Sequence, residues 1–141
     1  MTLRRICRVA LVMMVVGSSV GRVDSQSGPA STAVVRSEAL PNVPGKKLTA
    51  VVVNYAPGGK SAAHRHAGSV FVYVLSGAIR SENSATGPAK VYRAGETFFE
   101  PAGSAHLVSE NASATEAASL LAVFVADEGA QLTVPGAGPK P

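Results

Sequence analysis

The chain of 141 residues has little of several residue types, and each shortage excludes a class of protein. It has no tryptophan and one cysteine, Cys7, so an intramolecular disulfide framework and a zinc site made of several cysteines are both excluded. Only 16% of the residues are charged and 46% are hydrophobic, which is too apolar for a disordered chain. The length allows one domain of ordinary size.

Motifs of several enzyme classes are also missing beyond residue 25. No serine there lies in a Gly-x-Ser-x-Gly elbow, and no cysteine is present to act as a nucleophile. The run Gly58-Gly59-Lys60-Ser61 lacks the upstream glycine of a phosphate-binding loop. These absences remove the most common hydrolase and nucleotide-binding mechanisms.

The first 25 residues have the three parts of a secretory signal peptide. Residues 4–8 carry three arginines, residues 9–16 are all apolar, and small residues follow. The apolar run is too short for a mature transmembrane helix, which needs about 20 residues. We therefore predict a signal peptide at 1–25, cut after Gly21 or Ser25, and an exported protein, periplasmic or secreted. A buried N-terminal helix and an uncleaved anchor are the alternatives.

Removal of this leader changes the charge of the protein. Four of the 13 basic residues and one of the nine acidic residues lie in 1–25, so the net charge falls from +4 to +1. Nucleic-acid binding needs a basic stripe with aromatic residues, and the remaining chain has no such cluster. We expect no nucleic-acid partner, and no membrane association after cleavage.

The remaining chain alternates short apolar runs with glycine and proline turns, which predicts an all-β sandwich or barrel. Residues 26–46 form a lead-in and first strand, 47–126 the barrel, and 127–141 an edge strand and loose tail. Within the lead-in we expect 26–33 to be flexible. The expected strands are 34–37, 47–55, 70–75, 78–82, 89–93, 97–99, 106–109, 118–125 and 132–134.

All three histidines of the chain lie beyond the leader, beside glycine-rich turns. His64 and His66 are two residues apart, so on an extended segment both point to the same side. His106 follows 40 residues later, and a barrel brings such distant segments together on one interior face. The alternative is that the three histidines lie on surface turns and have no common function.

The residues around these histidines form two patterns in a fixed order. They resemble the two motifs of the cupin superfamily, specifically its small single-domain bacterial members, over residues 47–126. The resemblance implies an antiparallel jelly-roll (cupin) β-barrel with one domain. The matching positions are Gly58, His64, His66 and Gly77 in the first motif, and Gly95, Pro101, Gly103 and His106 in the second.

Two positions depart from the family pattern. The glutamate ligand of the first motif is replaced by Val70, and no acid lies between His66 and Gly77. The asparagine of the second motif is replaced by Glu110, with an asparagine one residue later. Two other acids near the second motif, Glu96 and Glu100, are candidates to approach the site from another strand.

The resemblance implies one divalent transition metal (Fe, Mn, Ni, Cu or Zn) bound by His64, His66 and His106. Three protein ligands leave open positions for a small organic molecule, which we expect to be anionic. The chemistry would be that of an oxygenase, hydrolase or isomerase, with no catalytic residue assigned. The alternative is a non-enzymatic small-ligand or metal-binding module, or a degenerate metal-free cupin. The family also implies a homodimer formed through an edge strand.

Strand alternation adds an expectation about the pocket. Phe71, Tyr73 and Leu75 share one face of their strand, and Val70 lies on the other. If Val70 occupies the ligand position of the family, its face makes an apolar pocket floor. Tyr73 and Tyr55 are expected to pack rather than to act as acids or bases.

Overall fold

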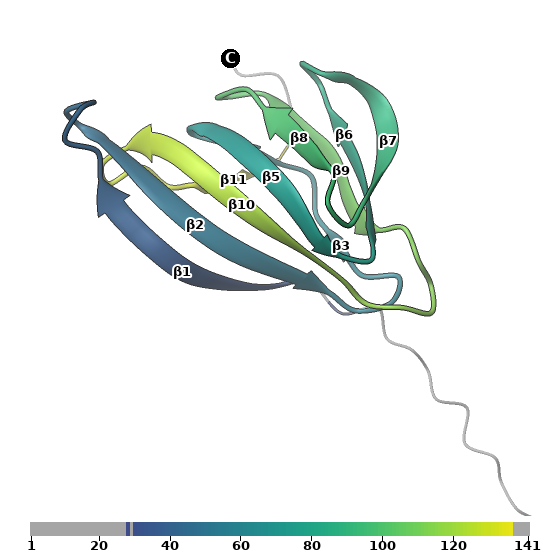
Figure 1. Ribbon diagram of the computed structural model, residues 1–141. Coiled ribbons are helices and arrows are strands. Elements are labelled where there is room, and N and C mark those ends of the chain that lie inside the picture. The colour runs from purple at the N-terminus through teal and green to yellow at the C-terminus, as the bar shows by residue number, and fades with distance from the viewer. Residues whose placement is uncertain (1–27, 29, 137–141) are drawn as a thin grey trace, which may run out of the picture.

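The structure, a computed structural model, describes residue 28 and residues 30–136 (Figure 1). The predicted leader and the end of the predicted tail, 137–141, lie outside the described residues. The part of the chain that is described forms eleven strands and no helix. It accordingly includes no helix long and apolar enough to cross a membrane.

Two antiparallel sheets make up the fold, as Figure 1 shows. The first sheet has the order β1-β2-β10-β5-β8, and the second has the order β11-β4-β9-β6-β7, with β3 paired to β9. The predicted all-β jelly-roll class is confirmed. The strands are β1 (Ser31–Ala39), β2 (Lys46–Tyr55), β3 (Lys60–Ser61), β4 (His64–His66), β5 (Ser69–Ser76), β6 (Ala78–Asn83), β7 (Gly87–Arg93), β8 (Thr97–Glu100), β9 (Ala105–Asn111), β10 (Ala118–Asp127) and β11 (Thr133–Pro135).

The prediction for the first strand is wrong in its length. Residues 31–33, expected to be flexible, belong to β1, which is paired along β2 from Ser31 opposite Asn54 to Ala39 opposite Lys47. The small polar residues at its start gave no strand signal, but the long neighbouring strand supplies hydrogen-bond partners for their backbone. Strands β3 and β4 were not predicted because two or three residues show no periodicity.

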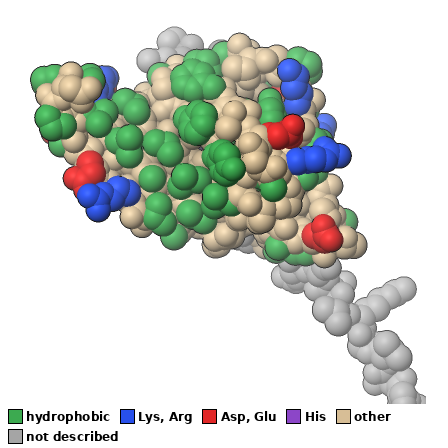
Figure 2. All heavy atoms as spheres, in the orientation of Figure 1, with side chains coloured by type: hydrophobic (Ala, Val, Ile, Leu, Met, Phe, Trp, Pro, Cys, Tyr) green, Lys and Arg blue, Asp and Glu red, His purple; other side chains and the backbone are tan. Residues whose placement is uncertain are grey.

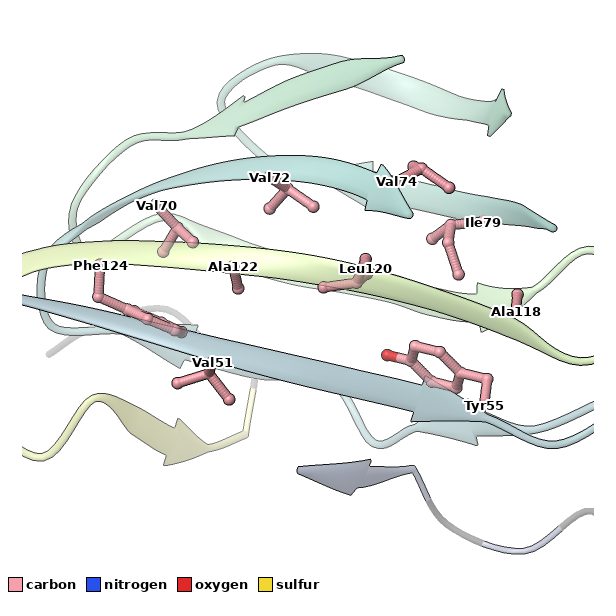
Figure 3. Packing of buried hydrophobic residues seen from close by; sticks show 10 residues of the cluster. All are labelled: Val51, Tyr55, Val70, Val72, Val74, Ile79, Ala118, Leu120, Ala122 and Phe124. Carbon is pink, nitrogen blue, oxygen red and sulfur yellow. The ribbon is translucent and has the colours of Figure 1, made fainter. Parts of the chain in front are cut away.

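The core lies between the two sheets and follows the two-residue period of the strands. Val70, Val72 and Val74 on β5 are all at most 2% exposed. Across from them on β10, Leu120 and Phe124 point to the same interior, as Figure 3 shows. The apolar face predicted for β5 is therefore the inner wall of the barrel.

The opposite face of the same sheet carries exposed apolar side chains. Phe71, Tyr73 and Leu75 alternate with the buried valines and are 40–47% exposed, and Phe99 and Val125 lie on neighbouring strands. Figure 2 shows hydrophobic side chains gathered over this sheet. Tyr73 therefore lies outside the barrel, away from the candidate site. Homodimer formation stays a prediction.

The turn between β5 and β6 explains one glycine of the first motif. Gly77 has a φ of +68°, and a Cβ there would lie 2.7 Å from the carbonyl oxygen of Ala117. Both the backbone conformation and the close approach require glycine at this position. The turn leads the chain from the first sheet into β6, which carries two residues of the site.

Candidate metal centre

The pairing of β4 with β9 brings the three histidines together. His64 and His66 lie on the same side of β4, and His64 is directly opposite His106 in the β4–β9 register. One nitrogen from each ring lies within 4.8 Å of the others. His66 and His106 are buried, and His64 is half-buried. Residues 40 positions apart thus form one cluster that could hold a metal ion.

Backbone carbonyl groups determine which nitrogen of two histidines carries the proton. Nδ1 of His64 lies 2.7 Å from the carbonyl oxygen of Ala62, and Nδ1 of His66 lies 3.0 Å from that of Leu132. A carbonyl oxygen only accepts, so each neutral ring donates through Nδ1–H and keeps its lone pair on Nε2. These two Nε2 atoms lie 3.1 Å apart.

That arrangement fits a metal ion. Two lone pairs at 3.1 Å face each other without a proton between them, and a cation would resolve their repulsion. Two nitrogen ligands about 2.1 Å from one metal and at right angles to each other lie about 3.0 Å apart. The separation of the two Nε2 atoms therefore matches neighbouring ligands on one ion.

Burial also keeps these rings neutral, which is the form that binds metal. Burial lowers the pKa of His64 below 6.5 and outweighs the hydrogen bond to Ala62. Burial likewise lowers the pKa of His66 below 6.5, although the charge of Glu100 opposes the shift. At neutral pH both lone pairs are available.

His106 reaches the cluster from β9 between two polar neighbours. A hydrogen bond of 2.9 Å joins its Nε2 to the hydroxyl of Ser81. Its Nδ1 is buried and lies 3.0 Å from Oε2 of Glu100, but no hydrogen bond of acceptable angle satisfies this nitrogen. A buried nitrogen without a hydrogen-bond partner is a second indication that the cluster accommodates a cation.

Glu100, one of the two acids considered from the sequence, lies inside the barrel. It is 2% exposed, it is directly opposite Val70 in the β5–β8 register, and Asn83 donates a hydrogen bond of 3.2 Å to its Oε2. Burial alone would raise the pKa of Glu100, but the imidazoles of His106 and His66 and the amide of Asn83 together bring it below 4.5. Glu100 is therefore a carboxylate at neutral pH.

The second candidate acid, Glu96, takes no part in the cluster. Its side chain is exposed and accepts a hydrogen bond from the backbone N–H of Arg93 in the turn before β8. It does not line the cavity described next.

A cavity of about 490 Å³ opens beside the histidines. Val70 and Val72 line it, so the predicted apolar floor is confirmed, and Phe124 adds a ring whose centroid is 5.0 Å from that of His66. Among the described residues that line the cavity, Lys60 is the one cation. The size and mostly apolar lining suit a small organic molecule.

Tyr55 also lines the cavity and is 3% exposed. Its hydroxyl is hydrogen-bonded to Ser61 at 2.9 Å and to Ser109 at 2.7 Å. This fully partnered hydroxyl agrees with the packing role expected from the sequence.

Two residues that support the site were missed in the sequence. Ser81 contacts His106 and Asn83 contacts Glu100, both from β6. They follow Ile79 at two-residue intervals and are buried like it, so all three side chains point inward. The two-residue period of this strand was the available signal, because it places two polar residues on the same face as Ile79.

The fold and the histidine cluster define a jelly-roll barrel with a candidate metal centre. Residues 51–124 match the Cupin domain family, and the chain belongs to this family. Among curated proteins none matches the chain.

Solved structures agree in fold. An uncharacterized conserved protein with a double-stranded beta-helix domain from Klebsiella pneumoniae is 23% identical, covers 77% of this chain and 86% of that one, and has a TM-score of 0.60. A DMSP lyase from Ruegeria pomeroyi is 18% identical, covers 92% of this chain and 62% of that one, and has a TM-score of 0.62. Bacillus subtilis oxalate decarboxylase, which has Mn(II) centers, is 26% identical. The match covers 62% of this chain and 23% of that one, with a TM-score of 0.52. This chain spans less than a quarter of that decarboxylase.

Proposed function

We propose that this cupin binds one divalent transition metal through His64, His66 and His106. The observation that carries the proposal is the pair of Nε2 lone pairs 3.1 Å apart, each ring held in that tautomer by a backbone carbonyl. Imidazole ligands suit Fe(II), Mn(II), Ni(II), Cu(II) and Zn(II), so the identity of the ion stays open.

The partner of the metal is a small organic anion held in the neighbouring cavity. The cavity volume of about 490 Å³ lies in the range of small-molecule sites, and the apolar wall would exclude water from a bound molecule. Lys60 adds a positive charge to the lining, which supports an anionic group on the ligand.

Two roles are consistent with such a site. When bound, the metal would supply a Lewis acid or a centre for oxygen chemistry. An oxygenase, hydrolase or isomerase would use chemistry of this kind. The chain would bind and orient the anion through Lys60 and the apolar wall. The same site without turnover would be a small-ligand or metal-binding module. Fold alone does not choose between these roles.

We propose further that the protein is exported, on the basis of the leader in residues 1–25. Fractionation of the native cells followed by mass spectrometry tests this directly. The exported form should begin after Gly21 or Ser25. An intact N-terminus found only in the cytoplasm would contradict export.

The metal content of the protein tests the central proposal. Wild-type protein purified from its own exported compartment should carry about one metal ion per chain by elemental analysis. His106→Ala should lose it, because one of three ligands is removed. Glu96→Gln is the matched control, since its exposed side chain is outside the cavity, and it should keep the metal. Metal-free wild-type protein would refute the proposal.

A second assay separates enzyme from binder. The metal-loaded protein is incubated in air with a panel of small carboxylic acids, and products are analysed by mass spectrometry. Product formation that is absent from His106→Ala would support an enzyme. Binding of an acid without turnover would support the binding module.

A further inference from the structure

The position of Glu100 bears on the missing glutamate of the first motif. Val70 and Glu100 are direct partners on the neighbouring antiparallel strands β5 and β8, and both are at most 2% exposed. Directly opposed residues have Cβ atoms about 5 Å apart and point to the same face. A carboxylate at position 100 therefore enters the barrel beside the place where one at position 70 would enter.

The carboxylate of Glu100 also lies within ligand distance of two of the three histidines. Its Oε2 is 3.0 Å from Nδ1 of His106 and 3.8 Å from Nε2 of His66. Two ligands about 2.1 Å from one ion are separated by about 3.0 Å when adjacent and by at most about 4.2 Å when opposite. Both distances fall in this range.

The positions of the protons on the histidines near Glu100 also suit a role of this carboxylate as a ligand. If Nε2–H of His106 donates to Ser81, Nδ1 of His106 presents a lone pair to the carboxylate. Nε2 of His64 and Nε2 of His66 present lone pairs as well. With that tautomer, no proton lies between the carboxylate of Glu100 and the facing nitrogens of His66 and His106, which is the arrangement of metal ligands rather than of a hydrogen bond.

We propose that Glu100 is the fourth metal ligand, so that the carboxylate lost at position 70 is supplied from the adjacent strand. This inference rests on the proposed metal site. It gives the ion three neutral nitrogens and one negative oxygen. His64, His66, His106 and Glu100 all line the cavity, so a small molecule bound there would have access to the ion.

The main competing role for Glu100 is that of a hydrogen-bond acceptor that only orients His106. In that case Ser81 would donate to Nε2 of His106, and Nδ1–H of His106 would point to the carboxylate. A positioning residue and a ligand differ in two measurable ways. Loss of a ligand changes the electronic spectrum of the metal directly, and a carboxylate entering from the opposed position should restore both the affinity and the spectrum.

The test measures Zn(II) affinity by competition with a chromogenic chelator, and records the visible spectrum of the Co(II)-loaded protein. Glu100→Gln keeps the size of the side chain but removes its charge. It should weaken Zn(II) binding by more than about 100-fold, beyond the 10–100-fold typical of residues that only support a ligand. It should also shift the Co(II) bands. Glu96→Gln, an exposed carboxylate outside the cavity, should change neither.

The double variant Val70→Glu/Glu100→Gln provides the second readout. It moves the carboxylate to the opposed position and should recover at least 10-fold of the lost affinity. The proposal is overturned if Glu100→Gln binds Zn(II) like the wild type with an unchanged Co(II) spectrum. Lost affinity with no recovery in a folded double variant would assign Glu100 to positioning and would also reject it. Wild-type protein that binds neither metal would refute the site itself.

Discussion

Phe124 links the hydrophobic core to the candidate metal centre. Its side chain is 5% exposed and lines the cavity, and its ring meets that of His66 at 75° with centroids 5.0 Å apart. Replacing it with alanine therefore tests both the packing of the inner wall and the support of one histidine.

The expected magnitude follows from this environment. Truncation of a buried phenylalanine to alanine costs about 3–5 kcal/mol of unfolding free energy. One side of Phe124 faces the cavity and already lacks packing partners, so we expect the lower end, about 3 kcal/mol. With a urea dependence of about 1.5 kcal/mol per molar, the midpoint of unfolding should fall by about 2 M. Loss of the ring beside His66 should also weaken metal binding, by about 10-fold.

Phe99→Ala is the matched control on the other face of the sheet. Phe99 is 50% exposed and is opposed by Phe71 on β5. Cross-strand pairs of this kind contribute about 0.2–1 kcal/mol, so the midpoint should fall by less than about 0.7 M and metal binding should not change.

Urea unfolding of the metal-free proteins, followed by circular dichroism because the chain has no tryptophan, gives the comparison. Equal midpoint shifts in the two variants would refute the assignment of inner and outer faces.

Three further predictions concern pH, ligand charge and a turn. Because burial lowers the pKa of His64 and His66, the unfolded chain takes up protons first. The metal-free protein should therefore lose stability as the pH falls below 6.5, and thermal unfolding at pH 7.5 and 5.5 checks the sign. Lys60→Gln should weaken the binding of a small carboxylic acid by about 10-fold without changing metal content, as calorimetry and elemental analysis can show. Gly77→Ala should destabilise the fold more than Gly87→Ala, because both glycines have positive φ but only at Gly77 would a Cβ clash. If urea unfolding shows that Gly77→Ala and Gly87→Ala lose the same stability, the positive φ alone would explain both losses.

Much of the fold could be predicted from local patterns. The alternation in β5 identified both its buried and its exposed face before the sheet was known, because side chains on a strand alternate strictly. The start of β1 could not be predicted in the same way. Its residues are exposed along the whole strand, and pairing with β2 rather than side-chain burial holds it in place.

The candidate site was predictable in part for a similar reason. His64 and His66 share a face in any extended segment, so their proximity is a local property. The opposition of His106 to His64 depends on the register of β4 with β9, which no local pattern contains. The contact of Ser81 with His106 depends in the same way on β6 lying beside β9, and the contact of Asn83 with Glu100 depends on the packing of β6 against β8 of the other sheet.

The chain by itself determined the all-β class, the spacing of the three histidines and the absence of the first-motif carboxylate at Val70. These are properties of residue type and separation along the chain. Only the tertiary structure could choose between Glu96 and Glu100, because both acids lie close to the second motif in sequence. The pairing of β8 with β5 turns Glu100 inward opposite Val70, and the preceding turn leaves Glu96 in solvent. Strand register, a long-range property, thus places the carboxylate beside the histidines.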